Sequence, residues 1–169
     1  MSIKLNKLCT INENKNTLTC FKAYDVRGEL GVNFDASIAY KIGRAVAQHL
    51  SAKVIVVGRD ARQSSPELAK ALISGITDSG ANVLDIGLSG TEEMYWAVTE
   101  FKACAGIEVT ASHNPINYNG LKFVKSGSQP LHYEQDFQVI KKIAEVSNWK
   151  FTRSGDSVKD ISYLARGAY

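Results

Sequence analysis

The sequence predicts an α/β fold in which helices cover both faces of a mostly parallel, mixed β-sheet. Two observations carry this prediction. From residue 18 onward, short runs rich in valine and isoleucine alternate with longer stretches whose apolar residues recur every three or four positions. Glycine, proline and asparagine lie between these segments, as they do at the turns of layered helix–sheet–helix proteins.

The first predicted unit is a helix followed by a buried strand. Either Asn33 or Asp35 can accept hydrogen bonds at the start of the helix. Its apolar positions are spaced four apart and are Ile38, Ile42, Val46 and Leu50. Residues 53–58 (KVIVVG) then form a strand, because they are β-branched and end in glycine.

A second helix is predicted to begin near Ser64. Ser64 and Glu67 fit a capping box, and Pro66 suits a first helical turn. We therefore expect Ser64 and Ser65 to act as helix caps and Gly80 to end the helix. The residues of its buried stripe are Leu68, Leu72 and Ile76.

Five further elements follow the same alternation. They are a strand at 82–87, a helix at 91–101, strands at 103–110 and 121–125, and a helix at 133–146. The short strand 121–125 can run antiparallel to its neighbour, because only a loop precedes it. In the last helix we expect Phe137, Ile140 and Ala144 to face the core.

The pattern divides the chain into three parts. Residues 1–17 are polar and irregular and are predicted to be an N-terminal extension, while 18–147 hold the alternating elements. Residues 148–169 are predicted to be a linker and the interrupted beginning of a second domain. The reason is that residues 147–160 are polar and aperiodic, whereas 161–169 begin a helical pattern and stop.

Composition excludes several classes of protein. A net charge of +3, with scattered basic residues, argues against nucleic-acid binding. No apolar run approaches the roughly 20 residues of a membrane span, and the first residues lack the apolar centre of a signal peptide. Cys9, Cys20 and Cys104 have no metal-binding spacing. We therefore expect a cytoplasmic protein with free thiols and no membrane partner.

The most informative candidates for catalytic residues lie in the segment 110–122 (TASHNPINYNGLK). Ser112 follows a predicted strand, at the edge where open α/β sheets bind ligands. Asparagine, proline and glycine can turn the loop back, so that Lys122 approaches Ser112 beside His113. A hydroxyl, an imidazole and an ammonium group suit phosphoryl transfer. From spacing alone, a serine that hydrogen-bonds its own backbone in a turn is the favoured alternative.

Resemblance to a known family favours the catalytic interpretation of Ser112 over that of a simple turn serine. Residues 110–122 resemble the phosphoserine loop of the α-D-phosphohexomutase superfamily. Residues 21–28 (FKAYDVRG) and 58–66 (GRDARQSSP) are similar to two further motifs of that family, in the same order. Residues 88–96 (LSGTEEMYW) and 125–131 (KSGSQPL) look most like the bacterial phosphomannomutases that feed GDP-mannose and surface-polysaccharide synthesis.

The resemblance implies a role for five residues. Ser112 would carry the phosphoryl group, and the resulting phosphoserine would be one ligand of Mg²⁺. Lys122 would act as a general acid/base, and His113 would be a supporting polar contact. Tyr24 and Arg27 would face the same site and bind substrate together with Lys122. Because a phosphoserine carries roughly −1.5 to −2 charge, the guanidinium of Arg27 is well shaped to hold it.

The implied reaction interconverts hexose 6-phosphate and hexose 1-phosphate, with a hexose 1,6-bisphosphate as activator. In the family, further Mg²⁺ ligands come from an Asp-Gly-Asp-x-Asp-Arg loop, which this sequence lacks. The alternative is therefore an inactive fragment that binds only a phosphosugar or a partner. Sugar preference and oligomeric state stay open. For Arg59, Asp60 and Arg62, a structural loop network and substrate contact are equally favoured.

Overall fold

The computed structural model describes residues 17–147, Trp149 and residues 157–166, and it contains one six-stranded sheet. The strands are β1 (Val26–Glu29), β2 (Val54–Arg59), β3 (Asn82–Leu88), β4 (Ala105–Val109), β5 (Tyr118–Lys125) and β6 (Val158–Asp160). The helices are α1 (Ala36–His49), α2 (Ser65–Asp78), α3 (Thr91–Glu100), α4 (Gln138–Val146) and α5 (Ser162–Arg166). A 3-10 turn, η1 (Ser126–Ser128), and a π-helical turn, η2 (Tyr133–Phe137), precede α4.

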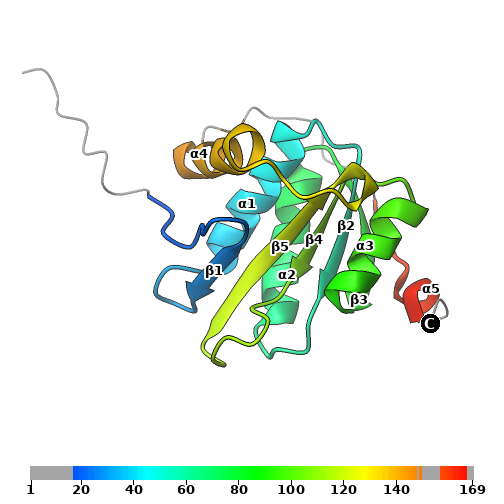
Figure 1. Cartoon of the computed structure of the whole chain (residues 1–169), viewed down its shortest axis with the longest axis horizontal. Helices are drawn as coiled ribbons and strands as arrows, with labels where there is room; N and C mark the ends of the chain where they lie inside the picture. Colours follow the sequence, from blue (N-terminus) through cyan, green and yellow to red (C-terminus); the bar gives the residue numbers. More distant parts are fainter. Residues whose placement is uncertain (1–16, 148, 150–156, 167–169) are drawn as a thin grey trace, which may run out of the picture.

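The sheet is mixed and mostly parallel, with the order β1-β5-β4-β2-β3-β6 (Figure 1). Strand β2 pairs in parallel with β3 and β4, and β3 pairs in parallel with β6. Strand β5 is antiparallel to both β4 and β1. The α/β class and the mixed, mostly parallel sheet predicted from the sequence are therefore confirmed.

Helices cover the two faces of the sheet unequally. On one face, α1, α2 and α4 pack over the larger core, which includes Ile55 and Val57 of β2. On the other face, α3 packs over a smaller core, which includes Val56 of β2 and Val124 of β5 (Figure 1). Alternate residues of a strand face opposite sides, so β2, β3 and β5 contribute side chains to both cores.

The backbones of α1 and α2 lie unusually close together. A Cβ atom added at Gly43 would lie 2.4 Å from the Leu72 carbonyl oxygen, and one at Gly75 would lie 2.1 Å from the Tyr40 carbonyl oxygen. Any side chain at either position would therefore force the helices apart. These two glycines account for the dense layer that supports one face of the sheet.

Several predicted helix boundaries are confirmed and one capping prediction is wrong. Asp35 caps α1 by accepting a hydrogen bond from the Ile38 amide at 2.8 Å. Ser64 precedes α2 as predicted, but its side chain forms no capping hydrogen bond, so the Ser64–Glu67 capping box is not formed. The Ser64 hydroxyl instead accepts a hydrogen bond from the Asn119 side chain, on a strand far away in the sequence.

The sequence reasoning also missed two strands and shortened a third. Strand β1 was not predicted, and the predicted strand 121–125 begins at Tyr118 and, as expected, runs antiparallel. The linker interpretation is wrong for Val158–Asp160, which form β6 at the edge of the sheet. The two missed strands, β1 and β6, are short, and they are specified by their partner strands rather than by their own apolar pattern.

Other predictions concern thiols and membrane spans. Cys20 is buried and Cys104 is half-buried, and both are free thiols; Cys9 and most of the predicted extension lie outside the described residues. Burial raises the pKa of Cys20 from 9.0 to about 11, so its thiol stays protonated and unreactive. None of the helices in the described ranges combines the length and the apolar character that crossing a bilayer requires.

One buried carboxylate joins three elements at the end of the sheet away from the Ser112 loop. Asp136 in η2 accepts hydrogen bonds from His49 of α1 at 3.0 Å and from Lys125 of β5 at 3.1 Å. The backbone amide of His132 donates a third, at 2.9 Å. Burial alone raises the pKa of Asp136, but these hydrogen bonds outweigh it and lower the pKa from 3.8 to about 2.

Asp136→Asn should therefore destabilise the chain and change its acid denaturation. At neutral pH we expect the free energy of unfolding to fall by about 1–3 kcal/mol, because buried donors lose their charged acceptor. In the wild type, the stabilisation from Asp136 is present above the unfolded pKa and is lost as the pH falls through about 2. Urea unfolding at several pH values measures both effects. Glu134→Gln, an exposed change in the same turn, is the control; equal behaviour of the two variants would contradict this account.

Candidate active site

The Ser112 loop lies where two parallel strands end side by side. Strands β2 and β4 are neighbours, so the loops that follow them meet at the same edge of the sheet. The antiparallel strand β5 begins at this edge, and the loop between β4 and β5 carries Ser112. Ser112 therefore lies in the loop after the carboxyl end of β4, as the sequence predicted.

The guanidinium group of Arg62 organises this loop from the inside. Its Nη1 donates to the carbonyl oxygens of Pro115 at 2.8 Å and Tyr118 at 3.0 Å. Its Nη2 donates to the carbonyl oxygens of Ser112 at 2.9 Å and Asn114 at 2.6 Å. Four carbonyl groups therefore converge on one planar cation, which only arginine can supply.

A second set of hydrogen bonds holds Arg62 in place. The Asp60 carboxylate accepts from the Arg62 amide at 3.0 Å and from the Ser65 hydroxyl at 2.5 Å. The buried Asn119 side chain donates to the hydroxyls of Ser64 at 2.8 Å and Ser65 at 2.9 Å. The two serines that we expected to cap α2 instead join the loop after β2 to strand β5. Of the two alternatives for Asp60 and Arg62, a structural loop network and substrate contact, the structure contains the loop network.

Ser112 is exposed and has an unusual backbone conformation. Its φ angle is 53°, in the left-handed region, where a non-glycine residue costs about 1–3 kcal/mol. The Ser112 amide donates to the Thr110 hydroxyl at 3.0 Å, and the Ser112 Oγ lies 3.2 Å from Nδ1 of His113. Within the described residues this imidazole is the hydroxyl's one hydrogen-bond partner, so the simple turn serine of the alternative interpretation is not what the structure contains.

Arg27 connects the N-terminal motif to the Ser112 loop. It lies on β1, and its Nη1 donates to the Thr110 carbonyl oxygen, two residues before Ser112. Its Nε is 2.9 Å from the carboxylate of Asp25. The Arg27 side chain is largely buried, and its hydrogen bond to Thr110 links β1 to the end of β4. Asp25, which sequence reasoning did not single out, orients it.

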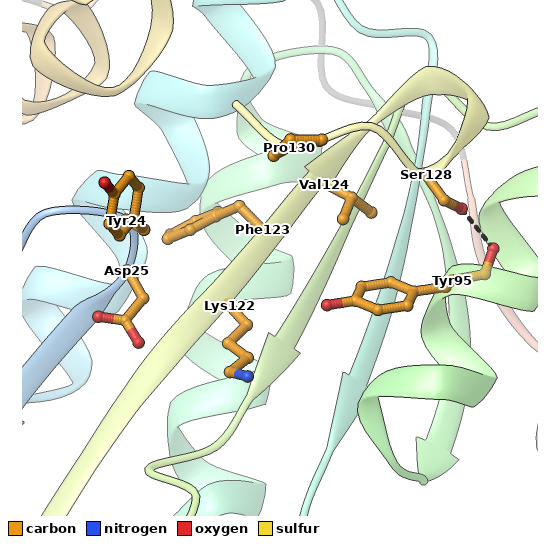
Figure 2. Close-up of a pocket in the computed structure, with 8 residues that line it drawn as sticks. All are labelled: Tyr24, Asp25, Tyr95, Lys122, Phe123, Val124, Ser128 and Pro130. Carbon is orange, nitrogen blue, oxygen red and sulfur yellow. Dashed lines mark hydrogen bonds between the residues drawn. The ribbon is translucent and has the colours of Figure 1, made fainter. Parts of the chain in front are cut away.

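Tyr24 and Lys122 lie together in a pocket of about 330 Å³ on the face of the sheet that α3 covers only in part. Figure 2 shows Tyr24 and Asp25 on one side of this pocket, Tyr95 on the other and Lys122 between them. The hydroxyl of Ser128 donates to the Tyr95 backbone oxygen at 2.6 Å and so ties η1 to α3. The full lining is Tyr24, Asp25, Tyr95, Lys122, Phe123, Val124, Ser128 and Pro130.

The predicted site residues therefore form two adjacent groups. Ser112 and His113 belong to the loop, and Tyr24 and Lys122 line the pocket, whose lining does not include Ser112. The ion pair of Arg27 with Asp25 lies between them, because Asp25 lines the pocket while Arg27 reaches the Thr110 carbonyl. Contact of Lys122 with Ser112 stays a prediction. Lys122 is opposite Glu108, four residues before Ser112.

Glu108 is the most unusual ionisable residue near the site, and the sequence reasoning overlooked it. It interrupts the otherwise apolar strand β4, and it is 1% exposed. Burial is the main cause that raises its pKa, from 4.5 to about 8; a hydrogen bond from Ser89 opposes this rise, and nearby carboxylates add to it. A single acidic residue inside a buried strand was the signal that could have revealed it.

The described residues alone do not make a magnesium site. Among them, no three His, Cys, Asp or Glu side chains gather closely enough to hold a metal ion. A phosphate on Ser112 would add oxygen ligands at one position only, whereas Mg²⁺ binds six ligands in octahedral geometry. The described residues therefore fit one part of a Mg²⁺ shell and not the rest.

If Arg62 fixes the loop, Arg62→Lys should loosen it without unfolding the sheet. Lysine cannot donate to four carbonyl groups, so the amides that close the loop's turns, those of Asn114 and Tyr118, should become exposed more often. We expect their hydrogen exchange to accelerate about tenfold or more. Arg59→Lys, three residues earlier at the end of β2, is the control. Unchanged exchange in Arg62→Lys would show that other contacts hold the loop.

Comparison with known proteins agrees with this geometry. The chain is 44% identical over 154 residues to a phosphomannomutase of Salmonella montevideo, a match that covers 91% of this chain and 32% of the relative. It is 52% identical over 128 residues to a phosphomannomutase of Klebsiella pneumoniae, covering 76% of this chain and 82% of the relative.

A solved structure gives the same result. The crystal structure of a phosphoglucomutase/phosphomannomutase family protein from Burkholderia thailandensis superposes with a TM-score of 0.77 at 33% identity, covering 88% of this chain and 34% of that one. The chain thus spans about a third of the length of most of these relatives. The family model for phosphoglucomutase/phosphomannomutase, alpha/beta/alpha domain I, matches residues 18–150. With its fold, its Ser112 loop and these matches in agreement, the chain belongs to the phosphoglucomutase/phosphomannomutase family and contains the family's domain I.

Proposed function

We propose that this chain is the phosphoserine-bearing domain of a phosphomannomutase-type phosphohexomutase. In this proposal the enzyme interconverts hexose 6-phosphate and hexose 1-phosphate in the cytoplasm, for the synthesis of GDP-mannose and polysaccharide. The relatives named above are phosphomannomutases, which favours mannose over other hexoses. The single observation that carries the proposal is the exposed Ser112 hydroxyl on a strained loop that Arg62 holds by four carbonyl groups.

The proposed chemistry uses Ser112 Oγ as the carrier of one phosphoryl group. The bond between phosphorus and Ser112 Oγ breaks while a bond forms to a free hydroxyl of the hexose phosphate, which gives a hexose 1,6-bisphosphate. The hydroxyl loses a proton and Ser112 Oγ gains one, so the step balances. Transfer of the other phosphoryl group back to Ser112 then releases the isomeric hexose phosphate.

The neighbouring side chains have complementary roles in this proposal. Lys122, a cation in the pocket, would neutralise phosphate charge and supply the proton that Ser112 Oγ gains. His113, 3.2 Å from Oγ, would orient the nucleophile. Tyr24 is 82% exposed at the pocket and would contact the sugar, while Arg27 would stabilise the loop and the phosphate from β1.

The proposal also includes Mg²⁺ and a hexose 1,6-bisphosphate activator. When bound, Mg²⁺ would neutralise charge on the transferred phosphoryl group, and a Ser112 phosphate oxygen would be its ligand in this chain. The described residues contain no carboxylate cluster to complete the shell, so the other ligands would come from elsewhere. A domain that only binds phosphosugars, without turnover, is the alternative outcome of the test below.

The role of Ser112 can be tested in a chimera in which this chain replaces the matching part of the Salmonella montevideo relative. The chimera should convert mannose 1-phosphate to mannose 6-phosphate, and Ser112→Ala should lower turnover by about 10³-fold or more. Mass spectrometry after incubation with hexose 1,6-bisphosphate should place one phosphate on Ser112. Ser74→Ala, an exposed change on α2, is the control.

Two results would contradict the assignment of Ser112. One is phosphate found on another residue while Ser112 is unmodified. The other is a folded chimera that binds the phosphosugar but does not turn it over, which would favour the alternative of a binding domain.

The role of Lys122 gives a separate test in the same chimera. Lys122→Ala should lower turnover by about 10²-fold, because both a proton donor and a positive charge are lost from the pocket. Lys142→Ala removes an exposed lysine from α4 and should leave turnover unchanged. Near-normal turnover in Lys122→Ala would mean that this lysine only lines the pocket.

A further inference from the structure

The carboxyl group of Glu108 occupies a small space built from three elements. Both of its oxygens lie 3.1 Å from the hydroxyl of Ser89, which precedes α3. A Cβ atom at Gly58 of β2 would lie 2.2 Å from Glu108 Oε2 and 2.3 Å from Ser89 Oγ, so glycine is required there. The absence of a side chain at Gly58 therefore leaves the room that the Glu108 carboxyl group and the Ser89 hydroxyl occupy.

The surroundings of Glu108 favour the neutral acid. The charged groups that act on its pKa are Asp60 in the loop after β2 and Glu92 and Glu93 in the first turn of α3. Lys122 is its neighbour on β5 in the strand ladder. The three carboxylates disfavour another negative charge nearby, and burial adds to this effect. Glu108 forms no ion pair with any residue in the described ranges, and a buried carboxylate without a cation is costly. With a pKa of about 8, Glu108 is protonated at neutral pH.

Lys122 is the direct cross-strand partner of Glu108. The two Cα atoms are opposite each other in the antiparallel ladder of β4 and β5. Directly opposite residues point to the same face, with Cβ atoms roughly 4.5–5.5 Å apart. Lys122 is half-buried and lines the pocket, where its ammonium group lies between Tyr24 and Tyr95 (Figure 2).

We propose that Glu108 is a positioning residue for Lys122: as a neutral acid it leaves the ammonium group free for a phosphate in the pocket, and as a carboxylate it draws that group back onto the sheet. The proposal rests on the function proposed above, since it takes the pocket ligand to be a phosphosugar. The ligand chemistry is that of a phosphate ester, which a free ammonium group attracts and a paired one does not.

The switch has a defined direction. Below about pH 8 Glu108 holds its proton and Lys122 is available; above it, the carboxylate competes with the ligand for Lys122. Because the folded pKa is higher than the unfolded value of 4.5, the stabilisation linked to Glu108 is complete below that value and is lost as the pH rises through about 8. Phosphate binding in the pocket should therefore weaken over the same alkaline range.

Nuclear magnetic resonance on the wild-type chain can test the pairing without any variant. The Glu108 carboxyl carbon and the Lys122 side-chain carbon next to nitrogen should show a common titration step near pH 8 as the pH is raised from about 6 to about 9.5. Lys125 on the same strand is the matched control, because its partner Asp136 has a pKa of about 2 and stays ionised throughout. Glu108→Gln should abolish the Lys122 step. Titration of Glu108 near 4.5, or a Lys122 signal without a step, would overturn the proposal.

Ligand binding gives the functional readout. By calorimetry, the affinity of the wild-type chain for mannose 1-phosphate should fall about tenfold between about pH 7 and about pH 9, and that of Glu108→Gln by at most about twofold. Equal losses of affinity in both proteins would overturn the proposal. Absence of binding in both proteins at both pH values would count against the phosphosugar function, while the resonance titration still decides the pairing of Glu108 with Lys122.

Discussion

The convergence of four carbonyl groups on the Arg62 guanidinium is the interaction on which the candidate site depends. A loop that carries a reactive hydroxyl must be exposed, yet an exposed loop has little apolar contact to hold it. Here the backbone of the loop curls round a cation that is itself fixed by Asp60 and by the start of α2. The left-handed backbone of Ser112 can persist because these contacts determine the loop's conformation.

The unequal cover of the sheet explains where the pocket lies. Three helices close one face, whereas α3 on the other face reaches only as far as Val124 of β5. Lys122 points to the same side two residues earlier, beyond the edge of that helix, so it lines a pocket rather than a core. The bend before β1 thus supplies Tyr24 and the antiparallel strand β5 supplies Lys122, while the Ser112 loop follows the parallel strand β4. The ion pair of Arg27 with Asp25 connects these two parts.

Sequence patterns predicted the main helices, the buried strands and the position of the Ser112 loop, because each of these depends on local periodicity or turn residues. They could not predict that Ser64 would bind Asn119 instead of capping α2, since that choice is made by residues 55 positions away. Strands β1 and β6 were missed because the ladder that forms them is non-local. The roles of Arg62 and Glu108 were also beyond reach, because a charged residue in a loop or strand does not reveal its partners. Family resemblance singled out Ser112 as the candidate phosphoserine, and the structure supplied what surrounds it.

In the proposed function, Arg62 supports the loop while a phosphate on Ser112 would face away from it, towards the groups proposed to take part in transfer. A crystal structure of the chain with phosphoserine incorporated at position 112 tests this directly. The account predicts that Arg62 keeps its hydrogen bonds to the four carbonyl oxygens and that the phosphate contacts His113 or Lys122. A structure in which Arg62 leaves the carbonyl groups to bind the phosphate would contradict it, because the loop would then be held by its ligand and not by the fold.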